Sequence, residues 1–304
     1  MNIRLAPVFL VAGGFLAACN GNGGNSSNMT PVQFTSFSAV QNNQATTANG
    51  VSQSANVVGS TQTTLSAVDR ASSTAQFTYT GIGTIAPVMT AFGFTAPGTS
   101  VSWSGSTVDC VTLAPICSAS NSNSTGRVVN ALDPSLGWNY QSFGVWLVTT
   151  SLSSTTLGAM SFGSPTLASN VPTSGSGAYN GRSGGAYVDP AGNLFTFSGT
   201  MNSTVNFGTQ AITFNSTANQ ITSVSGLVVP PPTNILTINT SLTYAPGSNQ
   251  FSGPVTAAGQ GTGLTGTLNG TFYGPTAQEM GGTFSLNAVA PSREAVVGGF
   301  GGKR

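Results

Sequence analysis

The feature that most constrains this chain is an alternation of apolar and polar residues with period two, which is clearest after residue 175. Phe195, Phe197, Met201, Val205 and Phe207 fall on one face of such a segment, and the Thr, Ser and Asn residues between them fall on the other. Successive side chains of a β-strand point to opposite faces, so this pattern indicates strands with one buried face. No long segment keeps apolar residues at helical spacing. We therefore predict an all-β fold.

The same alternation recurs and gives eight expected strands in the second half of the chain. They centre on residues 179–187, 195–207, 212–214, 236–244, 251–255, 264–272, 284–286 and 296–300. Eight such strands joined by Gly, Pro and Asn turns predict a small antiparallel barrel, which has no exposed edges. Alternation alone leaves open whether the apolar face points into a filled barrel or outward to lipid, as in a membrane-spanning barrel.

The first half is less regular. Short strands are expected at residues 32–40, 75–82, 99–103 and 140–148, and residues 41–66 are expected to form long loops or weak edge strands. Residues 150–176 are rich in Ser, Thr, Gly and Pro, and 172–175 marks a junction. Residues 230–232, three prolines, predict a stiff loop between the third and fourth barrel strands. We predict a β-rich N-terminal domain over 31–170 and a barrel over 171–304.

The N-terminus carries an export signal. Residues 1–4 include one positive charge, residues 5–18 are mostly apolar, and the run ends in Leu-Ala-Ala-Cys, which resembles the bacterial lipobox. In such signals the leader, here 1–18, is removed and the Cys, here Cys19, is lipidated. Residues 19–30 then form a lipidated tether, and the acyl chains anchor the protein in a membrane, expected to be the bacterial outer membrane. The alternative is an ordinary secretory signal in which Cys19 is incidental.

Cysteine usage agrees with export. If Cys19 is lipidated, Cys110 and Cys117 remain as a pair on either side of Pro115. Such pairs oxidise in extracytoplasmic compartments, so we expect a disulfide. A metal site would need further ligands, and the chain has no histidine.

The C-terminal third resembles a known family. Residues 271–284 (TFYGPTAQEMGGTF) and the final residues 297–304 (VGGFGGKR) are similar to the C-terminal signature of transferrin-binding-protein-B-like surface lipoproteins. Residues 140–146 (YQSFGVW) resemble the strand before the barrel in that family. The resemblance implies a handle-like β-rich N-terminal domain followed by an eight-stranded antiparallel β-barrel. We expect the signature residues to shape a turn, with Glu279 orienting that turn through hydrogen bonds, and not to bind a ligand.

Charge and composition exclude several functions. Charged residues make up 4% of the chain and nearly cancel, so nucleic acid is not an expected partner. Without histidine, Gly181–Gly185 (G-x-S-x-G, with Ser183) lacks the base of a nucleophile elbow, and the G-x-G-x-x-G at residues 261–266 enters a β pattern and not a helix. We predict no enzyme activity, no catalytic or metal-binding residues and no cofactor.

The remaining function is binding. The resemblance implies an outer-membrane or surface-anchored lipoprotein that binds a macromolecular partner, with an iron-carrier protein as one example. Capture of haem or another small ligand and a structural envelope role are the alternatives, and the orientation toward periplasm or cell surface stays open. We expect binding through loops of residues 31–170, because large inward side chains should fill the barrel. These are Phe195, Phe197, Leu264, Leu268, Phe272 and Phe284. Trp103, Trp138 and Tyr140 are candidate contacts, although for each residue taken alone a buried core position is favoured over a contact role.

Overall fold

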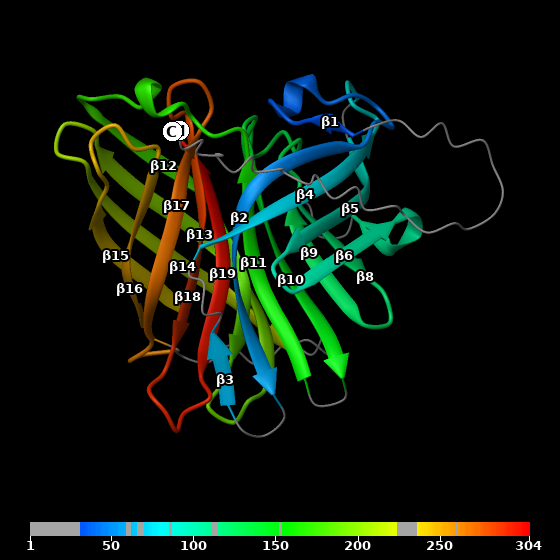
Figure 1. The fold of residues 1–304 in the computed structure, drawn as a ribbon, viewed down its shortest axis with the longest axis vertical. Helices are drawn as coiled ribbons and strands as arrows, with labels where there is room; N and C mark the ends of the chain where they lie inside the picture. Colours follow the sequence, from blue (N-terminus) through cyan, green and yellow to red (C-terminus); the bar gives the residue numbers. More distant parts are fainter. Residues whose placement is uncertain are drawn as a thin grey trace, which may run out of the picture.

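The structure is a computed structural model that describes residues 31–58, 62–65, 70–84, 87–110, 115–151, 154–223, 236–259 and 261–304. Two β-sheets lie side by side in it, with the N-terminal half forming one sheet and the C-terminal half the other (Figure 1). Cys19 and the three prolines at 230–232 lie outside the described residues. None of the helices among the described residues is long and apolar enough to cross a membrane.

The C-terminal sheet is a closed antiparallel barrel, as the alternation predicted. Its first and last strands pair with each other, so the ring has no free edge. The strands run in chain order around the barrel: β12 (Ser176–Val188), β13 (Leu194–Asn206), β14 (Ala211–Ser223), β15 (Thr237–Thr243), β16 (Gln250–Ala258), β17 (Thr265–Tyr273), β18 (Glu279–Asn287) and β19 (Ala295–Lys303). Each of the eight segments expected from the sequence contributes one of these strands.

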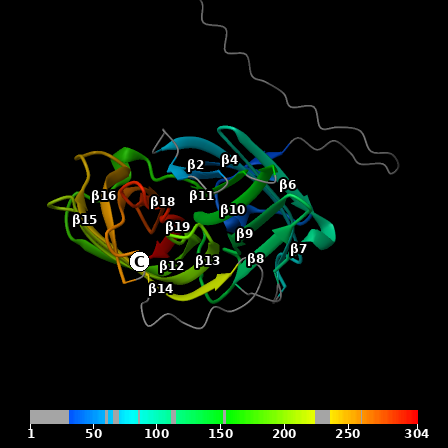
Figure 2. The same cartoon turned by 90° about the horizontal axis from the view of Figure 1, so that it is seen from below.

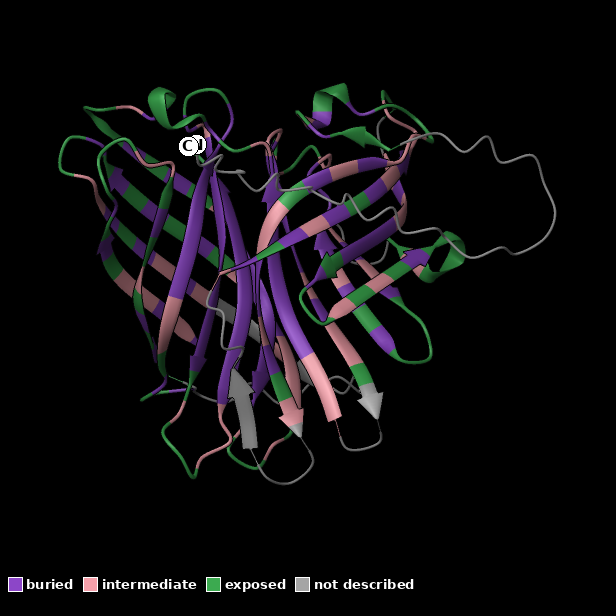
Figure 3. Ribbon diagram, in the orientation of Figure 1, coloured by how far each residue is buried: buried purple, intermediate pink, exposed green. Residues whose placement is uncertain are grey.

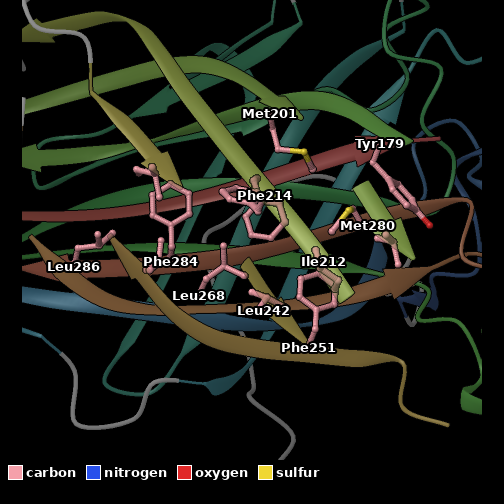
Figure 4. Close-up of a cluster of buried hydrophobic side chains, with 14 of the residues drawn as sticks. Tyr179, Met201, Ile212, Phe214, Leu242, Phe251, Leu268, Met280, Phe284 and Leu286 are labelled. Carbon is pink, nitrogen blue, oxygen red and sulfur yellow. The ribbon is translucent and has the colours of Figure 1, made fainter. Parts of the chain in front are cut away.

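The apolar face of these strands points inward and fills the barrel (Figure 4). Phe272 lies at the centre of an aromatic group, with its ring centroid 5.2 Å from that of Phe251 and 5.3 Å from that of Tyr244. Phe284 stacks on Phe300 with a centroid distance of 6.4 Å. Glycines provide room for these rings: a Cβ on Gly270 would lie 2.0 Å from Phe251. The orientation left open by the sequence is thus that of a filled barrel.

The N-terminal sheet is larger and open. Its strands follow the order β6-β5-β4-β2-β11-β10-β9-β8-β7, with β1 and β3 paired to β2. The bounds are β1 (Val32–Gln33), β2 (Thr46–Val58), β3 (Gln62–Leu65), β4 (Ala71–Thr80), β5 (Val88–Ala96), β6 (Thr99–Ser104), β7 (Val108–Asp109), β8 (Ile116–Ser120), β9 (Ser124–Val129), β10 (Gln141–Ser151) and β11 (Ser154–Gly163). Short 3-10 turns occur at η1 (Phe37–Ala39), η2 (Gly105–Thr107) and η3 (Ala168–Asn170).

This sheet is curled (Figure 2). It encloses an aromatic core of its own. Trp103 of β6 stacks on Phe92 of β5, with ring planes 2° apart. The same indole reaches across to β9, where a Cβ on Gly126 would lie 2.6 Å from it. Phe94 stacks on Trp146 of β10 with a centroid distance of 5.0 Å. The curl therefore brings strands that are distant in the sheet order around one set of rings.

Two expectations for the first half, those for residues 41–66 and 32–40, are wrong. Residues 41–66 hold β2, an interior strand between β4 and β11. β11, within the Ser- and Thr-rich residues 150–176, is a second interior strand that was not expected. β2 buries small residues such as Ala48 and Ala55, and the buried Leu157, Met160 and Phe162 of β11 stand among Ser, Thr and Gly. Neither strand therefore shows a regular alternation of large apolar residues. Residues 32–40 are mostly not a strand: only β1 pairs, and Phe37 enters the aromatic core from η1.

The two sheets meet across a broad contact. Strands β2, β10 and β11 lie against the outer side of β18, β19 and β12. Figure 3 shows the result as colour: β13 and β16 are striped, whereas β18, β19 and most of β11 are continuously buried. A small apolar cluster, containing Ala55, Leu157, Ala159, Ala186, Val188 and Val297, lies between the sheets.

Candidate functional site

The barrel interior offers no room for a ligand in the described residues. Phe197, Leu264, Leu268, Phe272 and Phe284, which the sequence assigned to the lumen, are at most 4% exposed, and Phe195 packs against them as a partly buried residue. Tyr179 is also enclosed, and its hydroxyl donates to the carbonyl of Ala277 at 2.6 Å. Burial raises the pKa of this tyrosine, so its phenol stays protonated. The lumen is therefore a packed core.

The motifs that resemble catalytic sites have structural positions. Ser183 lies within β12, faces the lumen and receives a hydrogen bond from Ser216 at 2.6 Å. A nucleophile elbow needs a strand-to-helix turn, which is absent at this position. The glycines at 261 and 263 have positive φ in the turn before β17. Among the described residues no group of three His, Cys, Asp or Glu side chains could hold a metal ion.

The C-terminal signature lies at the contact between the sheets. Glu279, the first residue of β18, is 1% exposed, and its carboxylate accepts three backbone N–H groups from the chain entering β10. Asn139 donates to Oε1 at 2.6 Å, and Tyr140 and Gln141 donate to Oε2 at 2.9 and 3.0 Å. We expected Glu279 to orient its own turn. Its carboxylate instead accepts hydrogen bonds from a segment about 140 residues earlier in the chain.

The environment of Glu279 sets its protonation. Burial raises its pKa above the ordinary glutamate value, while the three N–H donors and the nearby Lys303 act in the opposite direction. Lys303 itself donates to the carbonyl of Gly137 at 2.7 Å, which ties the end of β19 to the same loop. The carboxylate thus has specific partners on one side and a low-dielectric surrounding on the other.

Neighbouring signature residues add further contacts between the sheets. The Tyr273 hydroxyl and Ser161 Oγ are 2.9 Å apart and hydrogen-bonded. Thr166 Oγ1 donates to the carbonyl of Gly274 at 2.6 Å, and the Thr166 amide donates to the carbonyl of Phe272 at 2.8 Å. These contacts bind the segment after β11 to the β17–β18 turn, so the signature acts as a fastening between the two halves of the chain.

Glycines on the outer side of β18 and β19 permit the close approach of β10. A Cβ on Gly301 would lie 2.4 Å from Gln141 Nε2, and one on Gly281 would lie 2.7 Å from Gln141 Oε1. Gly299 meets the ring of Phe143 in the same way, at 2.8 Å. Gln141 is completely buried, and its side-chain amide has no hydrogen-bond partner among the described residues. The glycine-rich end of the chain is therefore a surface shaped to receive another strand.

Arginines fix the borders of this contact. Arg70, just before β4, donates to the carbonyl of Gly270 at 3.2 Å and to Thr271 Oγ1 at 2.7 Å. Arg127 of β9 donates to Thr196 Oγ1 of β13 at 3.3 Å. Burial lowers the pKa of both guanidinium groups, yet arginine stays charged at any physiological pH. Neither arginine could be assigned this role from the sequence, because no local motif surrounds it.

The disulfide lies at the far edge of the N-terminal sheet. A disulfide bond joins Cys110, directly after β7, to Cys117 in β8, and both residues are buried. The bond closes the loop between these short strands. It belongs to the aromatic core of the N-terminal sheet and not to the contact with the barrel.

The aromatic residues suggested as partner contacts are not exposed. Trp103 is 3% exposed and Trp138 is 4% exposed, so both belong to the N-terminal core, and Tyr140 is half-buried. Trp103 and Trp138 are buried because the core of the curled sheet is where a large aromatic side chain can bury most of its apolar surface. The exposed loops of the described N-terminal residues present Ser, Thr, Asn and Gly, as at η2 and at residues 121–123. A partner would therefore meet polar, uncharged groups there.

Comparison with known proteins agrees with this architecture. Residues 171–304 match the family described as the C-lobe and N-lobe beta barrels of Tf-binding protein B. The barrel is therefore similar to this family over its whole length. The matched segment contains the whole closed barrel and the signature that fastens it to the N-terminal sheet. No curated protein sequence matches the chain.

Several solved structures are similar to the chain. A tryptophan-to-alanine variant of transferrin binding protein B from Haemophilus parasuis is 12% identical with a TM-score of 0.44, and the match covers 87% of this chain and 77% of that one. The isotype 1 protein from Neisseria meningitidis is 18% identical with a TM-score of 0.46, over 84% of this chain and 43% of that one. A structure described as a surface lipoprotein is 18% identical, with a TM-score of 0.33, over 54% of this chain and 75% of that one.

Proposed function

We propose that this protein is a lipid-anchored envelope protein that binds a macromolecular partner through its outer surface. The observation that carries the proposal is the match of residues 171–304 to the Tf-binding protein B barrel family. The packed lumen supports it, because a barrel without internal space leaves only its outside, its loops and the N-terminal sheet for recognition. Loops on a rigid scaffold are where binding residues concentrate, so we place the partner site on the loops of residues 31–170.

An iron-carrier protein of the transferrin type is the first partner to test. The family name supplies this choice. Because charged residues make up only 4% of the chain, association should rely on shape and hydrogen bonds more than on electrostatic steering, and it should change little with salt.

Haem capture is the less favoured alternative. Without histidine, ligation would fall to Tyr or Met. The described Tyr179, Met201 and Met280 are fully buried in the packed lumen, where haem would have to displace the core. If the purified protein shows no visible absorbance after incubation with haem and removal of unbound haem, haem capture is the less favoured function.

The anchor is proposed from the lipobox alone. Cys19→Ser should release the protein from membranes or leave residues 1–18 uncut, because the acylated residue would be missing. A variant that stays membrane-bound with its leader cut elsewhere would contradict the anchor while leaving the partner proposal intact.

The partner proposal is tested with residues 20–304 immobilised and exposed to iron-loaded transferrin, with serum albumin as control. Saturable retention of transferrin alone is expected. Ser106→Lys and Ser122→Lys, both on exposed N-terminal loops, should weaken retention, whereas Thr209→Lys on an exposed barrel turn should not. Equal retention of both serum proteins would count against a transferrin-type partner. Weakening by Thr209→Lys alone would move the site to the barrel.

A further inference from the structure

A row of asparagines crosses the outer side of the barrel. Asn180 of β12 pairs with Asn202 of β13, Asn202 pairs with Asn215 of β14, and Asn215 pairs with Asn239 of β15. All four side chains are exposed or half-buried on the side away from the lumen. Neighbouring strands lie about 4.8 Å apart, so the row presents one carboxamide at each such step.

Part of this row is free to bind a ligand. Asn215 Nδ2 donates to Asn239 Oδ1, and Asn215 Oδ1 accepts from Thr217 at 3.0 Å. The side-chain amides of Asn180 and Asn202 make no hydrogen bond with any residue that the structure describes, and both side chains are exposed. Each therefore presents two donors and one acceptor oxygen.

The row forms the floor of a groove. The groove is shallow and largely open to solvent, and its volume is about 580 Å³. None of its lining side chains is charged, and the hydroxyl groups beside the asparagines come from Thr204, Thr213, Thr240, Ser241 and Thr256. Amide and hydroxyl groups thus surround the space, with Phe214 and Tyr179 beneath it.

The sequence of β16 explains why the wall is uneven at this point. β15 pairs with β16 only through Thr237, Ile238 and Asn239. Pro254 lies two residues before Thr256 on β16, just beyond the last of these pairs, and it has no N–H with which to continue the ladder. Its carbonyl accepts a hydrogen bond from Thr240 Oγ1 instead. The groove extends to this interruption, since Thr240 and Thr256 both line it.

We propose that this groove binds a neutral oligosaccharide. Carboxamides and hydroxyls both donate and accept, which matches the hydroxyl groups of a sugar, and the absence of charge in the lining gives no preference for phosphate or carboxylate. The repeat of the row is comparable with the length of one pyranose unit. Protein partners are usually held by exposed Trp, Tyr or Arg side chains, and the groove presents none of these on its outer row.

The test uses residues 20–304 on an array of purified neutral and acidic oligosaccharides, both free and linked to short peptides. Saturable binding to a neutral chain is expected, with no preference for acidic ones. The double variant Asn180→Ala/Asn202→Ala should lower affinity about tenfold or more, because two uncharged hydrogen-bonding groups are lost. Asn56→Ala, at an exposed strand position of the other sheet, is the matched control and should not change affinity. Unchanged circular dichroism would establish that the double variant is folded.

Three results would overturn the proposal: no saturable binding of any neutral oligosaccharide, equal binding by the folded double variant, or preferential binding of acidic chains. Self-association abolished by the double variant, without sugar binding, would instead assign the row to a contact between copies. Retention of free oligosaccharides would indicate a polysaccharide as the natural source, and retention of the peptide-linked ones alone would indicate a glycoprotein. The outcome does not depend on the partner proposed above, because the probes are purified sugars.

Discussion

The two walls of the barrel share one core and differ in their outer residues. On β13 and β16, buried and exposed residues alternate, and the outer positions are mainly Thr, Asn and Ser. On β18 and β19 nearly every residue is buried, and the outer positions include Gly281, Thr283, Gly299 and Gly301. The outer side of a barrel strand therefore reports its surroundings: hydroxyls and amides where it meets solvent, and glycine or small polar residues where a second sheet packs against it.

This difference separates assembly from recognition. The covered wall, formed by β18 and β19, carries most of the C-terminal signature. Hydrogen bonds of Glu279, Tyr273 and Thr166 join this signature to the N-terminal half. The exposed wall carries the asparagine row, where two amides remain unengaged among the described residues. The following predictions test whether this division holds, beginning with the largest expected effect.

The core that both walls share should be the most sensitive region. Phe272→Ala removes a ring that contacts those of Tyr179, Phe207, Tyr244 and Phe251, and it should lower the free energy of unfolding by about 3–5 kcal/mol. Chemical denaturation of residues 20–304 measures this loss. Asn202→Ala on the exposed wall is the control and should change stability by less than about 0.5 kcal/mol. Similar losses for the two variants would contradict the division between core and wall.

Loss of the Glu279 carboxylate should be the next largest effect. Glu279→Ala leaves three backbone N–H groups without their acceptor and should destabilise by about 3 kcal/mol. Because burial raises the pKa of Glu279, its contribution is full below the ordinary glutamate pKa and is lost as pH rises through the higher pKa of the folded protein. The difference between wild type and variant should therefore shrink with rising pH. A difference that grows across this window would show that the carboxylate is stabilised, and its pKa lowered, in the folded state.

The disulfide should matter less and only for the N-terminal sheet. Replacing Cys110 and Cys117 with Ser should cost about 2.5 kcal/mol, as expected for closure of a short loop. Thiol titration of unfolded, unreduced residues 20–304 should find no reactive thiol. Two reactive thiols would refute the bond. A changed hydrogen-exchange rate of the β18 amides in the Ser variant would show that the disulfide also affects the covered wall.

Crowding of the covered wall should give the smallest effect. Gly301→Ala places a methyl group against the buried Gln141 amide and should destabilise by about 1–2 kcal/mol, because the two sheets must separate slightly. Gly208→Ala, in an exposed turn where the nearest atom is 3.4 Å from the new methyl group, is the matched control. Equal stability of the two variants would mean that β10 does not approach the wall as closely as described.

The two walls also explain what could be predicted from the sequence. The barrel strands were recognisable because alternation is strong where one face is solvated, as in β13. β2 was missed because its buried positions include Ala48, Ser52 and Ala55, which are common in loops. β11 was missed because its Leu157, Met160 and Phe162 do not alternate regularly with polar residues. The lumen residues were predicted correctly, whereas the contacts of Glu279 were not, because its partners are about 140 residues away in the chain. Trp103 and Trp138 carried no local signal that distinguishes a core ring from a surface one.

Amide hydrogen exchange at residues 139–141 tests most directly whether the signature fastens the barrel to the N-terminal sheet. In residues 20–304 these three amides should exchange slowly, because each donates to Glu279. In Glu279→Ala they should exchange much faster, while the amides of β13, on the opposite wall, keep their protection. Unchanged protection of residues 139–141 in the folded variant would contradict the account.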